Sequence, residues 1–219
     1  MVVMKRIFTL TLFLICLFVS TLAVSADPLF TSQDLMYLHH MSIHHQQAVD
    51  MSDLLPGRTD REEFHRYASF VKRAQAAEID YMHSLMDQAE QRGQAVDREP
   101  LPGDPPMHGM LSSTQMQALE DSEGAEFERL WLEGMIYHHQ GAIDMSHMQQ
   151  QHQLDTGRRP FGLAVLVEDI IVEQRYEITK MHRWLREWKL VNEEIPVEQH
   201  HKIIMEQMAP ATMPSNHDH

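Results

Sequence analysis

The chain has 219 residues and a formal net charge of −14 with histidine neutral, because 32 acidic side chains outnumber 18 lysines and arginines. Such a surface repels nucleic acid and attracts cations, so the charge disfavours a nucleic-acid-binding protein. The only cysteine, Cys16, lies in the N-terminal apolar segment. Disulfides, zinc fingers, iron–sulfur clusters, covalent haem and cysteine catalysis are therefore excluded from the remainder, which is instead rich in methionine and histidine.

Residues 1–26 have the pattern of a secretory signal peptide. Lys5 and Arg6 precede an apolar run, and Val24 and Ala26 occupy the positions three and one before the expected cleavage site. This pattern predicts a periplasmic protein with no membrane span after signal cleavage. A single-span anchor is the alternative, but the apolar run is short for a bilayer.

Residues 27–92 are predicted to form a first helical hairpin. A capping box at Thr31 begins a helix that runs to about Leu55, where a Pro-Gly pair stops it. A second capping box, formed by Thr59 with a glutamate three residues later, begins a helix that Gly93 ends.

Residues 93–112 are rich in proline and glycine and are predicted to be a linker. A second helical hairpin is expected over 113–191. It begins with a short helix near 113–121 and continues with long helices over about 125–154 and 161–190.

An internal repeat relates the two hairpins. The segment MSIHHQQAVDMS at 41–52 returns as MIYHHQGAIDMS at 135–146, with eight of twelve positions identical. The second helices share a shorter signature, QAAEIDYMH at 75–83 and QRYEITKMH at 174–182. Two duplicated hairpins that cannot bury their apolar faces alone predict an all-α four-helix bundle, followed by a short C-terminal helix and tail.

The repeat places methionine and histidine on one helical face, because positions three or four apart lie on the same side. The stripe contains Met41, His44 and Met51 in one copy and Met135, His138, Met145 and Met148 in the other. The second histidines, His45 and His139, lie about 100° around the helix axis. One histidine of each pair should face the bundle centre and the other a seam between helices, and the sequence does not say which. Ordinary polar core histidines are the alternative.

Thioethers and neutral imidazoles together favour Cu(I) as the cofactor. Magnesium and calcium prefer oxygen ligands, and structural zinc usually takes thiolates. Silver(I) should bind similarly, and Cu(II) could use the histidines. The histidine pair occurs in both copies of the repeat with the same methionine spacing. This recurrence favours metal ligands over chance packing.

Two glutamates, Glu78 and Glu177, recur in the second helices of the hairpins. Di-iron bundles use Glu-x-x-His, whereas here the histidine follows the glutamate by five residues, so an iron site is disfavoured. We expect these glutamates to orient a ligand histidine or to pair with a cation. Further candidate ligands are Met82, His83, Met181 and His182, with ordinary core packing as the alternative for the methionines.

Residues 192–219 form a tail rich in methionine and histidine, with a helix expected to about Met208. In that helix His201, Met205 and Met208 share a face and are candidate ligands. The flexible residues beyond it include Met213, His217 and His219. Such a tail could capture copper loosely or pass it on, and a solvated tail with chance histidines is the alternative.

The segments FERLWLEGMIYHHQGAIDM and EQRYEITKMHRWL resemble domain-of-unknown-function family 305, and the likeness covers most of residues 30–190. The resemblance implies a ferritin-like bundle, and similar secreted proteins bind copper in the bacterial periplasm and support copper resistance. By this resemblance the motif positions are His44, His45, His138, His139, Met41, Met51, Met135 and Met145. Glu128 stands where the family often has aspartate, and Ser52 and Ser146 where alanine is common.

The leading hypothesis is a periplasmic protein that sequesters or shuttles copper, contributes to copper tolerance and has another copper-handling protein as its partner. It is not expected to be an enzyme, because the sequence has no nucleophile–base set, phosphate loop or dinucleotide fingerprint. Two alternatives remain open. One is a redox bundle, either a b-type cytochrome or a metal oxidase, and the other is a metal-free structural or adaptor bundle.

Overall fold

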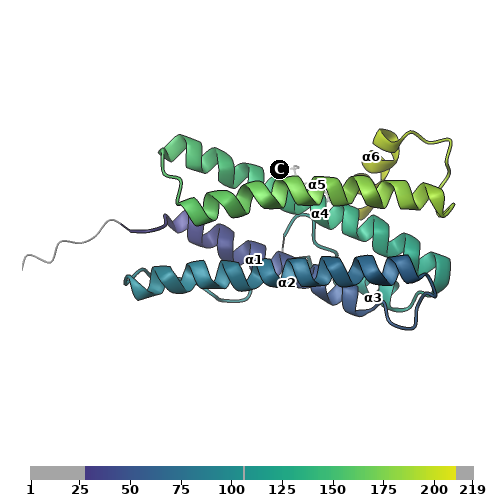
Figure 1. Cartoon of the computed structure of the whole chain (residues 1–219), viewed down its shortest axis with the longest axis horizontal. Helices are drawn as coiled ribbons and strands as arrows, with labels where there is room; N and C mark the ends of the chain where they lie inside the picture. The colour runs from purple at the N-terminus through teal and green to yellow at the C-terminus, as the bar shows by residue number, and fades with distance from the viewer. Residues whose placement is uncertain (1–27, 106, 211–219) are drawn as a thin grey trace, which may run out of the picture.

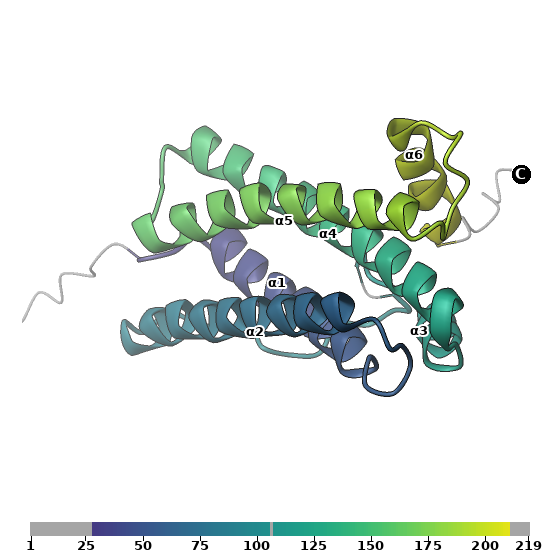
Figure 2. The ribbon, with the colours of Figure 1, turned by 45° about the vertical axis from the view of Figure 1, so that its right-hand side comes forward.

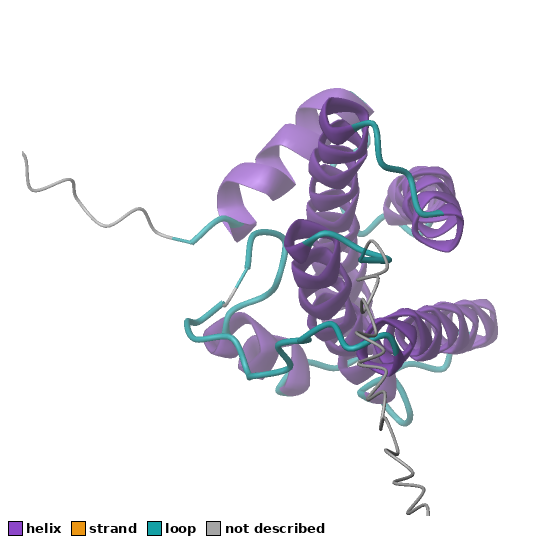
Figure 3. Cartoon of the chain, turned by 90° about the vertical axis from the view of Figure 1, so that its left-hand side faces the viewer, coloured by secondary structure: helices purple, strands orange, loops and turns teal. Residues whose placement is uncertain are grey.

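The computed structural model describes residues 28–105 and 107–210. The predicted signal peptide and the tail residues Met213, His217 and His219 lie outside this range. The helices of the described chain are α1 (Ser32–Asp53), α2 (Glu62–Gln91), α3 (Ser113–Glu120), α4 (Gly124–Thr156), α5 (Phe161–Glu187) and α6 (Val197–Met208). No strand occurs within the described residues (Figure 3), which confirms the predicted all-α fold.

Two antiparallel hairpins, α1 with α2 and α4 with α5, form the body of the molecule (Figure 1). They meet mainly through α1 and α4, which cross one another, whereas α2 and α5 touch far less (Figure 2). Their side chains form two apolar clusters, one containing Phe64, Phe127, Trp131 and Trp184 and the other containing Leu38, Met86, Leu163 and Leu166. Each large buried side chain contributes roughly 1.5–3 kcal/mol to folding.

The predicted helix starts are partly confirmed. Thr31 caps α1 in a capping box with Asp34, as its spacing indicates. The second capping box is wrong, because α2 begins after Arg61 with no side-chain cap. The Thr59 hydroxyl instead donates to the Glu128 carboxylate on α4 at 2.5 Å, a charge-assisted hydrogen bond that ties the hairpins together.

The end of the predicted linker packs against the crossing of α1 and α4. Gly109 lies so close to Gly141 on α4 that a Cβ atom built on Gly109 would be 2.5 Å from the Gly141 Cα. Leu111 is buried, and its backbone exchanges hydrogen bonds of 2.7 and 2.8 Å with the Gln47 side chain on α1. These contacts hold the linker over the crossing.

The last helix, α6, packs across α4 through the buried Ile204 (Figure 1). Of the helices that the structure describes, none is long and apolar enough to cross a membrane.

Candidate metal centre

Four histidine side chains are fully buried near the crossing of α1 and α4, each with 0 % of its surface exposed. On α1, one apolar cluster ends before His44 and His45 and the other begins after them. On α4, His138 and His139 separate the two clusters in the same way. Glutamines and glutamates occupy the corresponding stretches of α2 and α5. We call this group the polar layer. Its members are His44, His45, Gln75, Glu78, His138, His139, Gln174 and Glu177.

The first histidine of each repeat meets its counterpart across the crossing. The ring centroids of His44 and His138 are 3.9 Å apart, with an interplanar angle of 40°. The His138 Nε2–H donates to the His44 backbone carbonyl at 2.7 Å. The linker closes over His44, since a Cβ atom on Gly109 would lie 3.1 Å from the His44 Nε2.

The second histidine of each repeat meets a glutamate of its own hairpin. The His45 Nε2 lies 3.0 Å from the Glu78 Oε2, and the His139 Nε2 lies 2.5 Å from the Glu177 Oε2. The expectation that these glutamates contact histidines is met. A carboxylate that accepts the Nε2–H of a neutral imidazole fixes the tautomer and leaves Nδ1 with a free lone pair.

Several imidazole nitrogens in the polar layer have no hydrogen-bond partner among the described residues. They are the Nδ1 atoms of His45, His138 and His139 and both ring nitrogens of His44. Leaving a buried polar atom unpaired costs about 1–3 kcal/mol, so native proteins rarely tolerate a group of them. Such a group therefore points to a ligand.

Burial keeps the two facing histidines neutral. It lowers the pKa of His44 well below the ordinary 6.5, and the neighbouring His45 lowers it further. The pKa of His138 is also lowered well below 6.5, first by burial and then by His44. Neutral imidazoles are the form that binds metals.

The family model of DUF305, a domain of unknown function, matches residues 34–161. The chain belongs to the DUF305 family. Among curated proteins, no sequence matches it significantly.

Solved structures of two DUF305 proteins and of CopM resemble the chain over most of their own length. A protein from Streptomyces coelicolor is 28 % identical, with 71 % of this chain and 91 % of that one covered and a TM-score of 0.60. A fragment from Deinococcus radiodurans is 29 % identical, with 72 % of this chain and 97 % of the fragment covered and a TM-score of 0.59. CopM in its Cu(II)-bound form is 27 % identical, with 71 % of this chain and 97 % of CopM covered and a TM-score of 0.57. CopM has also been solved in Cu(I)-bound and Ag-bound forms.

Five of the predicted methionine ligands of this DUF305 chain are fully buried in the apolar clusters on either side of the polar layer. They are Met41, Met51, Met82, Met135 and Met181. Met145 is half-buried and packs against the cluster that contains Met41 and Met82. Met41 and Met51 share α1 with the first histidine pair, and Met135 and Met145 share α4 with the second, whereas Met82 and Met181 lie on the partner helices α2 and α5.

Two predicted site residues lie elsewhere. Met148 is 65 % exposed, and the prediction that it continues the buried stripe is wrong. Positions of the stripe alternate by four and three residues, and the step after Met145 should be four. The next buried residue is therefore Gln149, whose amide donates to Asp34. His83, next to Met82, is exposed on α2 because adjacent helical positions differ by about 100°.

The C-terminal candidates form a separate group. His182 on α5 meets His201 on α6, with the His182 Nε2 3.1 Å from the His201 Nδ1. Met205 and Met208 pack against the apolar core, where the Met208 sulfur lies 3.9 Å from the Gln115 amide. Residues 197–208 are thus a docked helix, and not a loosely attached segment.

Sequence reasoning missed Gln75 and Gln174, which are both 2 % exposed. The Gln75 Oε1 and both amide atoms of Gln174 lack partners within the described residues. The signal was present, since glutamine opens the shared signature of both second helices. His200 and Glu133, beside the α6 group, were also missed because they have no counterpart in the repeat.

Two grooves between α2 and α5 reach the glutamates of the polar layer. One of ≈740 Å³ is lined by Glu177, Glu173 and Glu63, and one of ≈380 Å³ by Glu78, Glu173 and Asp169. Throughout the described chain, no three His, Cys, Asp or Glu side chains converge as a metal cage. Thioether ligands beside the imidazoles would complete the coordination of a metal in the polar layer, and that donor set suits a soft ion.

Proposed function

We propose that this DUF305 protein binds copper and holds Cu(I) in the polar layer. The observation that carries the proposal is the set of buried, unpaired imidazole nitrogens on His44, His45, His138 and His139. A cation shared by such nitrogens would offset the cost of burying them. The copper-bound and silver-bound CopM structures support the same class of ion.

The surrounding groups suit a monovalent soft ion. Glu78 and Glu177 orient the imidazoles that they contact and add negative charge without entering the coordination sphere. The buried methionines on both sides of the polar layer offer thioether ligands, which favour Cu(I). Ag(I), similar in charge and softness, should occupy the same place.

The proposed role is storage and transfer of the ion without turnover. The four imidazoles have no exposed surface, so an organic substrate has no direct access to them. The smaller groove between α2 and α5 brings Glu78, Asp169 and Glu173 to the edge of the polar layer, where they would attract a cation, whereas Arg66 and Lys180 offset the acidic residues of the larger groove. We propose that this activity takes place in the periplasm, on the signal-peptide pattern of residues 1–26, with another copper-handling protein as donor or acceptor and copper tolerance as the result.

Cu(I) affinity measured by competition with a chromophoric Cu(I) chelator, under anaerobic conditions, tests the proposal. Replacing His44, His45, His138 and His139 together by glutamine should abolish the tightest binding, with folding checked by far-UV circular dichroism. The matched control replaces the exposed His83 and His147 and should leave that binding unchanged. If the folded fourfold variant competes for Cu(I) as well as the wild type does, the proposal fails.

A further inference from the structure

A second histidine group lies where α6 reaches α5. The His182 Nε2 and the His201 Nδ1 are 3.1 Å apart, and the two rings are tilted by 56° with centroids 5.4 Å apart. The ring of His200 lies 5.6 Å from that of His182. Two neutral imidazoles that point a nitrogen at one another share a single proton. We call His182 and His201 the α6 histidine pair.

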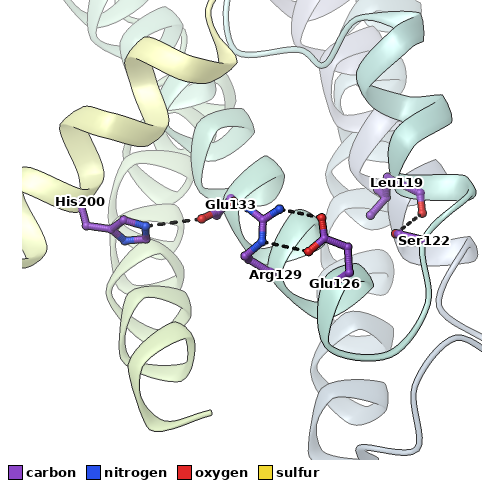
Figure 4. A network of polar contacts seen from close by, with 6 residues as sticks. All are labelled: Leu119, Ser122, Glu126, Arg129, Glu133 and His200. Carbon is purple, nitrogen blue, oxygen red and sulfur yellow. Dashed lines mark hydrogen bonds and ion pairs between the residues drawn. The ribbon is translucent and has the colours of Figure 1, made fainter. Parts of the chain in front are cut away.

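A polar network fixes the position of α6 and therefore of the pair. The His200 Nε2 lies 3.4 Å from the Glu133 Oε1 on α4 (Figure 4). Arg129 donates to Glu133 at 2.5 Å and to Glu126 at 2.7 Å, so the glutamate is itself held in place. Ile204 is 1 % exposed and anchors the next turn of α6 in the core. The position of His201 is thus set by a docked helix.

We propose that the α6 histidine pair is a separate, surface-accessible Cu(II) site. The two nitrogens are 3.1 Å apart. With an ion about 2 Å from each of them, the nitrogen–metal–nitrogen angle would be roughly 100°, close to that at a four-coordinate metal. Met205 and Met208 pack against the apolar core, and the groove that the pair lines contains no methionine, so the site offers imidazoles and not thioethers. Among common divalent ions, imidazole sites bind Cu(II) most tightly.

Metal binding at the pair requires no net loss of a proton. The proton shared by the facing nitrogens moves to the other nitrogen of its ring, and both lone pairs then face the ion. Burial, followed by the neighbouring His201 and His200, lowers the pKa of His182 to about 4, so the ring is already neutral. Burial also lowers the pKa of His201.

The pair is reachable from solvent on one side. It lines a groove of ≈540 Å³ together with Thr179, Arg183, Arg186 and Glu198. The arginines oppose a cation and Glu198 attracts it, so coordination by the two imidazoles has to provide most of the binding. Water can occupy the remaining positions of the ion, as is usual at an exchangeable site.

The duplication supplies an internal comparison. His83 on α2 occupies the repeat position of His182, but the first hairpin is followed by the linker and His83 is exposed. The site therefore arises once, where α6 follows the second hairpin. It also lies beyond residues 34–161 that match the DUF305 model.

The inference does not rest on the polar layer, and the test keeps the two apart. The background for the experiment is the protein whose polar-layer histidines His44, His45, His138 and His139 are replaced by glutamine. Substoichiometric Cu(II) is added, and paramagnetic broadening of backbone amide signals is followed by NMR. Broadening confined to residues 178–186 and 197–205 supports the pair, and broadening that leaves both segments unaffected overturns it.

Variants then identify the ligands. H182Q and H201Q should each weaken Cu(II) binding by more than the roughly 10- to 100-fold that loss of a supporting contact costs. H83Q is the matched control and should not change the affinity. His201 is half-buried, so H201Q gives a test even where H182Q loosens α6. Wild-type Cu(II) affinity in folded H201Q would overturn the proposal.

Discussion

The imidazole ring of His44 on α1 lies against that of His138 on α4, with 3.9 Å between the ring centroids, where the two hairpins cross. These residues occupy the same position in the two copies of the repeat. Equivalent residues of the two copies therefore meet at the crossing, as residues on the twofold axis of a symmetric dimer do. A ligand held here would be contacted by both copies of the repeat.

His44→Leu should stabilise the metal-free protein. Both ring nitrogens of His44 are buried without a partner among the described residues, and leucine removes two unpaired polar atoms while filling similar space. We expect a gain of about 1 kcal/mol in the free energy of unfolding, measured with urea, together with loss of the stabilisation that added Cu(I) produces.

His138→Leu is the matched comparison for His44→Leu. The His138 Nε2–H bonds to the His44 carbonyl, so leucine removes a buried hydrogen bond together with the unpaired Nδ1, and the gain should be smaller or reversed. Equal effects of the two substitutions on the metal-free protein would contradict the assignment of unpaired nitrogens to His44.

Acid should destabilise the metal-free protein. The pKa values of His44 and His138 are lower in the folded state than the unfolded value of about 6.5, so the unfolded chain binds more protons as the pH falls. Stability is therefore independent of these groups above about pH 7 and declines below about pH 6.5. Each histidine should cost up to about 1.4 kcal/mol at pH 5.5.

Urea unfolding at pH 7.5 and at pH 5.5 measures this decline. His182 should contribute in the same window, because burial lowers its pKa to about 4. The variant with leucine at His44 and His138 should lose less stability between the two pH values. An identical loss in the wild type and this variant would refute the assignment.

The helical hairpins could be predicted from sequence because their signals are local. The capping box at Thr31 and the double histidines of the repeat depend only on spacing along one helix. Contacts between segments far apart in the chain could not be predicted. Thr59 has the spacing of a cap, but its hydroxyl bonds to Glu128, and nothing near Thr59 in the sequence indicates that carboxylate.

The same limit applies to the candidate site. The repeat predicted which histidines are buried, since His44, His45, His138 and His139 are all fully enclosed. It could not show that the first histidines face each other and the second face the glutamates, because that depends on how α1 and α4 cross.

Gly141→Ala should destabilise the fold although alanine is the better helix former. A Cβ atom at Gly141 would lie 2.5 Å from the Gly109 Cα and 2.7 Å from the His108 carbonyl oxygen, both of them backbone atoms. The clash should exceed the gain of about 1 kcal/mol in helix propensity and displace the linker from His44. Urea unfolding would report a net loss of stability.

Gly134→Ala is the control on the same helix. A Cβ atom there would lie 3.1 Å from the ends of the Leu111 and Met51 side chains, which can move aside. We expect a smaller change in stability than at Gly141. Similar unfolding curves for both variants would show that the linker does not seal the crossing of α1 and α4.

Glu177→Gln tests how the glutamates support the copper site. The Glu177 Oε2 lies 2.5 Å from the His139 Nε2, so the substitution removes a negative charge that orients that imidazole and would stabilise a bound cation. Cu(I) affinity should fall by about 10- to 100-fold while the protein stays folded. Glu173→Gln removes a carboxylate from the same groove and should leave the affinity nearly unchanged, because Glu173 makes no hydrogen bond to a polar-layer histidine. Equal losses of affinity in the two variants would mean that the groove acts only through its overall charge, and that contact between the glutamate and His139 is not what supports copper binding.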